Sequence, residues 1–129
     1  MTSAIYAVIS TCILVWLTFQ VIKQRRTHKV ALGDGGKPGL QNAIGAHGNA
    51  VETIPIFLIL LFALEYNSGH LVLVHILGLL FTAGRIIHAL GLLSADLKGR
   101  VLGMKLTIFP IIALSVCNLI YLPYSKLLG

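Results

Sequence analysis

The sequence contains four long apolar stretches separated by polar segments, and this pattern limits the folds available to the chain. The stretches cover roughly residues 4–22, 43–64, 71–92 and 101–122. A hydrocarbon core of about 30 Å needs about 20 helical residues to cross it, and each stretch has about that length. None shows the alternation of polar and apolar residues that is typical of a half-buried strand. A strand at an open sheet edge would also leave backbone N–H and C=O groups without hydrogen bonds in lipid. The sequence therefore predicts an all-α integral membrane four-helix bundle, a single domain over residues 1–129.

The composition agrees with lipid as the solvent for this chain. It is 57% hydrophobic and 11% charged, whereas soluble domains carry about 25% charged residues. Cys12 and Cys117 both fall inside apolar stretches and lack the spacing of a metal site, so we expect no metal. The basic residues form no amphipathic or aromatic-interleaved run, so we expect no nucleic-acid partner.

The placement of lysine and arginine predicts the orientation in the membrane. Segment 23–39 carries five of these residues, segment 66–70 carries none, and three lie in or beside segment 93–100. Basic loops stay on the cytoplasmic side. We therefore expect loops 23–39 and 93–100 to be cytoplasmic and both termini to lie on the opposite side. The glycine-rich run within the first loop lacks the spacing of a phosphate-binding P-loop, which favours a flexible connection.

Several polar residues lie inside the apolar stretches, where a charge costs about 2.5–3.5 kcal/mol on insertion scales. Helical spacing places one set on a single face of the second stretch and another on one face of the third. The first set is Gln41, Gly45, Gly48, Asn49 and Glu52, and the second is Arg85 and His88. We expect Glu52 and Arg85 to meet between helices, either as a structural pair that fixes helix register or as part of a polar ligand site. Gly99 and Gly103 predict a close helix contact.

Two runs in these stretches resemble a known family. The run AHGNAVETIPIFLILLF at 46–62 and the run AGRIIHALG at 83–91 resemble the second- and third-helix signatures of the MAPEG family, the membrane-associated proteins in eicosanoid and glutathione metabolism. The chain length, the four spans and the basic first loop also agree with that family. The resemblance covers nearly the whole chain and is closest to a bacterial inner-membrane branch, similar to microsomal glutathione transferases.

The resemblance implies a homotrimer that binds glutathione as a co-substrate between subunits, at the cytoplasmic end. A lipophilic small molecule would arrive from the lipid bilayer and undergo conjugation or peroxide reduction. Carried over from the family, Arg26, Asn49, Glu52 and Arg85 would bind the ligand, with His88 beside them. Arg100 would be the catalytic residue that stabilises the thiolate.

The sequence also departs from the family pattern. Gly45 and Gly48 stand where family members often have arginines, and Leu92 and Met104 stand where several have tyrosines. A non-catalytic protein of the same fold, binding lipid or another amphiphile, is therefore the alternative to a glutathione transferase-like enzyme. A small multidrug exporter is disfavoured, because such proteins resemble each other in an acidic residue in the first helix and this chain has none there.

Overall fold

The computed structural model describes all 129 residues and contains helices but no strands. The four long helices are α1 (Ser3–His28), α2 (Pro38–Tyr66), α3 (Leu71–Leu93) and α4 (Leu97–Tyr121), and a short α5 (Tyr124–Leu127) follows. All four long helices are long and apolar enough to cross a membrane. The predicted fold class, an all-α protein with four membrane spans, is confirmed.

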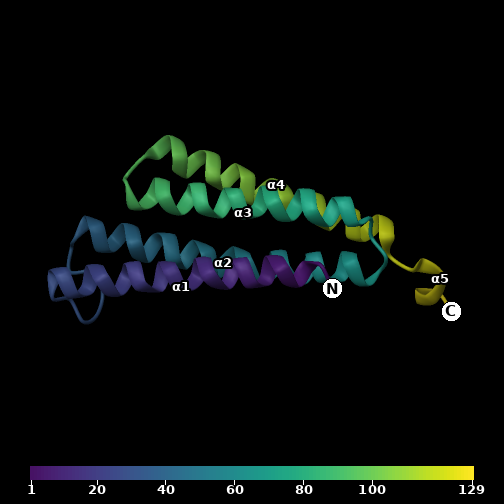
Figure 1. Ribbon diagram of the computed structural model, residues 1–129, viewed down its shortest axis with the longest axis horizontal. Helices are drawn as coiled ribbons and strands as arrows, with labels where there is room; N and C mark the ends of the chain where they lie inside the picture. The colour runs from purple at the N-terminus through teal and green to yellow at the C-terminus, as the bar shows by residue number, and fades with distance from the viewer.

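The four long helices lie side by side and form one elongated bundle (Figure 1). Helix α1 packs on α2 and α3, helix α4 packs on the same two helices, and α1 does not contact α4. The 29–37 connection and the α3–α4 turn lie at one end, whereas both chain termini lie toward the other (Figure 1). The two basic connections therefore share an end of the bundle, as the predicted topology requires.

Helix α4 begins earlier than the hydropathy pattern indicates. Asp96 is its N-cap residue, and the Asp96 carboxylate accepts a hydrogen bond from the Lys98 backbone N–H at 3.1 Å. The expected 93–100 connection therefore shortens to residues 94–96, and Arg100 lies in the first turn of α4 rather than in a loop. Hydropathy placed the start too late because Lys98 and Arg100 are helical but not apolar.

The 29–37 connection is a turn with its own hydrogen bonds. Lys29 ends α1 in the left-handed region, with φ of 54°, and the Arg25 guanidinium donates to the Gly33 carbonyl at 2.8 Å. The Asp34 carboxylate accepts from the Gly36 N–H at 2.9 Å. Arg25 therefore holds the end of α1 to the loop that follows it.

Helices α3 and α4 approach closely where glycines face backbone. A Cβ at Gly103 would overlap the backbone of His88, and a Cβ at Gly91 would lie 2.7 Å from the Gly99 carbonyl carbon. Side chains at these positions would force the helices apart. The close contact predicted from Gly99 and Gly103 is present, and it brings the polar groups of α4 within reach of those of α3.

The outer surface of the bundle is apolar. Only 27 of 129 residues are buried, and large side chains such as Phe19, Ile59, Leu79 and Leu119 are each 61% exposed. Such a surface is stable in hydrocarbon but not in water. The exposed faces of these helices therefore contact lipid or other copies of the chain.

A carboxylate at the end opposite the basic connections holds the start of α1. Glu65, near the end of α2, accepts hydrogen bonds from the backbone N–H groups of Thr2 and Ser3 at 2.5 and 2.6 Å. One turn further along α1, the Tyr6 hydroxyl is hydrogen-bonded to Nδ1 of His75 on α3 at 2.8 Å. These contacts fix the N-terminal end of α1 against both neighbouring helices.

Replacing Glu65 with alanine should loosen this end of α1. The variant leaves two N–H groups of the first turn without their acceptor, and losing such a cap costs about 0.5–2 kcal/mol. We expect a lower melting temperature in detergent and faster hydrogen exchange in the first turns of α1. Glu65→Gln, which keeps a side-chain oxygen as an acceptor for these N–H groups, is the matched control. Equal melting and exchange in both variants would contradict a capping role for Glu65.

Candidate functional site

A crevice of about 1030 Å³ opens on the side of the bundle, between α2 and the α3–α4 pair. Its lining comes from the N-terminal half of α2, the C-terminal part of α3 and the N-terminal half of α4, so it lies toward the end with the basic connections. The polar lining residues are Gln41, Asn42, Asn49, Glu52, His88, Arg100 and Lys105. The others are Ile44, Gly45, Gly48, Leu92, Val101, Met104, Ile108 and Phe109. Charged groups and apolar groups therefore share one opening.

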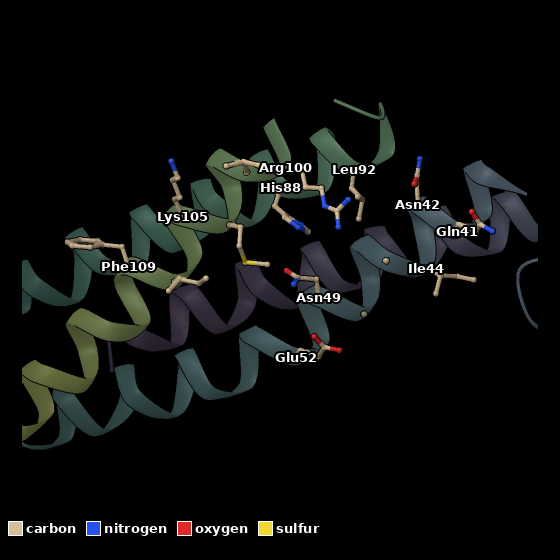
Figure 2. Close-up of a pocket in the computed structure, with 15 residues that line it drawn as sticks. Gln41, Asn42, Ile44, Asn49, Glu52, His88, Leu92, Arg100, Lys105 and Phe109 are labelled. Atoms are coloured by element: carbon tan, nitrogen blue, oxygen red, sulfur yellow. The ribbon is translucent and has the colours of Figure 1, made fainter. Parts of the chain in front are cut away.

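The crevice brings together four of the six predicted site residues. Asn49 and Glu52 line it from α2, His88 and Arg100 line it from α3 and α4, and Asn49 lies between Glu52 and the other two (Figure 2). Asn49 and Glu52 are three residues apart, so successive turns of α2 present them on nearby faces. Residues far apart in sequence thus converge on one cavity, as expected of a ligand site.

Arg85 lies behind the crevice rather than in its lining. It is 2% exposed, and its guanidinium donates to the Asn49 side-chain oxygen at 2.6 Å and to the Thr107 hydroxyl oxygen at 2.8 and 3.0 Å. The predicted meeting of Glu52 with Arg85 is wrong within the protomer. Asn49 occupies the position facing Arg85, whereas Glu52, one turn later, is exposed.

Arg26 lies outside the crevice of its own protomer. It is exposed near the C-terminal end of α1, and α1 contributes no residue to the lining. The neighbouring Arg25 is committed to the loop carbonyls. A contact between Arg26 and a ligand in this crevice therefore requires a second copy of the chain.

Sequence reasoning missed Thr107, which is fully buried on α4. The Thr107 hydroxyl donates to the Gly103 carbonyl at 2.8 Å, and its oxygen accepts both bonds from Arg85 described above. One signal could have found it. Thr107 lies four residues after Gly103, so it shares the helix face that the glycine spacing had assigned to the α3 contact.

The charged lining of the crevice favours an anionic group. Arg100 and Lys105 supply two cations against the single carboxylate of Glu52. Arg100 also lies in the first turn of α4, where the helix dipole disfavours a cation and favours an anion. His88, which lies between these cations and the core, is only 3% exposed, and its buried Nδ1 atom has no hydrogen-bond partner in the protomer.

Gly45 and Gly48 of α2 leave the crevice open. An added Cβ at Gly48 would meet no atom within 4 Å, and one at Gly45 would meet only the Leu92 side chain, at 3.2 Å. Glycine is therefore not required at Gly48 by packing. The space beside Gly48 is therefore open, and the space beside Gly45 is limited only by Leu92.

Comparison with known proteins agrees with this architecture. The profile of the MAPEG family matches residues 3–120. Two curated relatives, both called inner membrane protein YecN, come from Escherichia coli strains K12 and O6:H1 (CFT073). Each is 40% identical over 125 residues, which cover 97% of this chain and 95% of the relative. With four membrane-spanning helices and inner-membrane relatives, this chain is an integral inner-membrane protein and belongs to the MAPEG family.

Proposed function

We propose that the crevice binds glutathione or a similar thiol and presents it to lipophilic substrates dissolved in the membrane. The observation that carries this proposal is the convergence of Asn49 and Glu52 with His88 and Arg100 on one lateral opening. Glutathione carries two carboxylates, one ammonium and one thiol. The crevice offers Arg100 and Lys105 for anionic groups and Glu52 for a cationic one.

The chemistry follows from stabilising a thiolate beside an apolar surface. A free thiol has a pKa of about 8.5, and a nearby cation lowers it and raises the thiolate fraction. Arg100 is the cation suited to this role, because arginine stays charged at every accessible pH. Val101, Ile108 and Phe109 belong to the apolar part of the same lining, where a lipophilic reactant would lie.

Two reactions of a bound thiol are possible with these residues, and each is balanced in atoms and electrons. In conjugation, the thiolate sulfur forms a bond to an electrophilic carbon, the bond to the leaving group breaks, and the thiol proton goes to solvent. In peroxide reduction, two thiols reduce one hydroperoxide to an alcohol and water and are themselves oxidised to a disulfide. Both reactions need only the thiol, the lipophilic substrate and a cation that stabilises the thiolate.

The proposed assembly is a homotrimer, with each crevice completed by a neighbouring copy. Glu52 is 14 residues after Pro38, the first residue of α2, and a rise of about 1.5 Å per residue places it about 21 Å along the helix. Its side chain is nevertheless exposed in the single chain. A carboxylate facing lipid at that depth is costly, so its face should be covered by a neighbour, by ligand or by water. A neighbouring copy would also provide the route by which Arg26 reaches a ligand. Both loops at this end would be cytoplasmic, where glutathione is available.

Glutathione should raise the thermal stability of the detergent-solubilised protein. A ligand that binds only the native state at ten times its Kd stabilises by about 1.4 kcal/mol. We expect a dose-dependent rise in Tm that is smaller in Arg100→Met. The rise should be unchanged in Lys126→Met, which removes a cation at the opposite end of the bundle from the crevice. Wild-type protein without any shift up to tens of millimolar glutathione would overturn the proposal.

The open space at Gly45 and Gly48, with Leu92 and Met104 nearby, supports a second candidate function. Compared with a crevice that has arginines or tyrosines at these positions, this one has fewer polar groups to bind a tripeptide. It has more apolar surface to bind a single-chain amphiphile. The same melting experiment decides between the candidates. A shift with lysophospholipid but none with glutathione would favour a non-catalytic amphiphile-binding protein.

A further inference from the structure

A chain of hydrogen bonds crosses the bundle behind the crevice, from α4 through α3 to α2. The Thr107 hydroxyl donates to the Gly103 carbonyl at 2.8 Å. Arg85 donates to the Thr107 oxygen through Nε and Nη2, at 3.0 and 2.8 Å. Arg85 Nη1 donates to the Asn49 side-chain oxygen at 2.6 Å. The chain ends at Asn49, which lines the crevice.

The donors and acceptors in this chain have only one consistent arrangement. Threonine has one hydroxyl hydrogen, and Thr107 uses it on Gly103, so its oxygen can only accept from Arg85. Arginine has five N–H donors and no acceptor, so the amide atom of Asn49 that faces it must be the oxygen. The NH₂ group of Asn49 is therefore the end of the amide that remains for the crevice.

Arg85 is a buried charge without a carboxylate partner in the protomer, and this affects the groups bonded to it. Its guanidinium is almost fully buried and lies 5.9 Å above the Phe81 ring. Its three hydrogen bonds go to neutral partners, so no carboxylate neutralises it within the protomer. A buried charge polarises the groups bonded to it, which makes the Asn49 NH₂ a stronger donor. The same uncompensated charge favours an anionic group in front of Asn49.

We propose that Arg85 and Thr107 are positioning residues that fix Asn49 as a hydrogen-bond donor to the crevice. The ligand of this crevice must then present a hydrogen-bond acceptor to Asn49, namely a carboxylate, a peptide carbonyl or the thiolate, and not an ammonium group. This inference rests on the proposed binding function for its ligand, but the fixed orientation of the amide is a property of the protein alone. Thr107 thereby sets ligand specificity without touching the ligand.

The first test needs no ligand. In detergent-solubilised protein labelled with ¹⁵N-asparagine, the side-chain NH₂ signals of Asn49 are assigned by their loss in Asn49→Leu. The order parameter of the Asn49 NH₂ group should be high in the wild type, fall in Thr107→Val, which keeps the shape but removes the hydroxyl, and recover in Thr107→Ser. Equal order parameters in all three proteins would overturn the positioning role. If Thr107→Val does not fold, an Asn49 NH₂ group already mobile in the wild type would overturn it.

The second test measures the direction of the hydrogen bond to glutathione. Asn49→Asp keeps an oxygen for Arg85 but can no longer donate to the ligand. We expect its Kd for glutathione to rise at least tenfold, as far as in Asn49→Leu, whereas Asn49→Gln should retain part of the affinity. Wild-type affinity in Asn49→Asp would show that Asn49 accepts, and the proposal would be wrong. If the wild type binds no glutathione, the proposed function fails while the NMR test still decides the role of Thr107.

Discussion

Replacing Gly103 with alanine should destabilise the bundle although alanine is the better helix former. A Cβ at this position would overlap the backbone nitrogen, Cα and Cβ of His88, and backbone atoms cannot rotate away as a flexible side chain can. Overpacking costs about 1–3 kcal/mol and sometimes more, and an overlap with backbone atoms belongs at the upper end of that range, above the gain of about 1 kcal/mol in helix propensity. We expect a fall in Tm of at least about 5 °C in detergent.

The damage should extend from packing to the site. Moving α4 away from α3 separates Thr107 from Arg85, which leaves the buried guanidinium with fewer acceptors. The Gly103 variant should therefore have a lower Tm without ligand and also a smaller rise in Tm when glutathione is added. Gly48→Ala is the matched control, since the added methyl group meets no atom within 4 Å, and its Tm should equal or exceed that of the wild type. Similar melting of the Gly103 and Gly48 variants would contradict the close α3–α4 contact.

The fold was predictable because hydropathy and helix length act locally along the chain. Four apolar stretches of sufficient length leave few alternatives in a membrane, and the spacing of Gly99 and Gly103 indicated where two helices touch. Helix ends were less predictable, because they depend on capping by Asp96 and on Pro38 at the first position of α2, and a hydropathy average does not detect either effect.

The candidate site was predictable in part, and the failures have a common physical cause. Helical spacing placed Asn49 and Glu52 near one face, but it could not say which of them meets Arg85. That choice depends on the rotation and depth of α2 against α3, which many packing contacts set together. The structure gives Asn49 the contact and leaves Glu52 exposed. Thr107 was missed because a threonine in an apolar helix usually satisfies its hydroxyl within its own helix, and the packing that brings Arg85 to its oxygen cannot be read from the spacing.

The polar groups in and behind the crevice form two sets with different roles. Arg85 and Thr107 satisfy one another behind the crevice, whereas Glu52, His88 and Arg100 line it. Groups of the second set gain most from a ligand, because the protein itself leaves them with few partners. Loss of one of them should therefore impair binding or turnover more than folding.

Under the proposed transferase chemistry, Arg100→Met should reduce turnover by up to about 30-fold at pH 7, because only about 3% of the thiol is ionised at that pH without the cation. Methionine keeps the apolar stem and removes the cation, and Arg100 is exposed in the first turn of α4, so folding and assembly should be unchanged. The measurement is the rate of conjugation of glutathione to a lipophilic aryl halide in detergent micelles. Lys126→Met, at the other end of the bundle, should turn over at the wild-type rate.

The pH dependence identifies the role of Arg100. If Arg100 lowers the pKa of the bound thiol, the wild-type rate should rise with pH and level off below about pH 8.5, the pKa of a free thiol. Without the cation, only about 3% of the thiol is ionised at pH 7, and that fraction grows until the pH exceeds 8.5. The defect of Arg100→Met should therefore shrink steadily between pH 7 and pH 9.5. A rate ratio that stays constant over this range would mean that Arg100 holds the ligand without stabilising the thiolate.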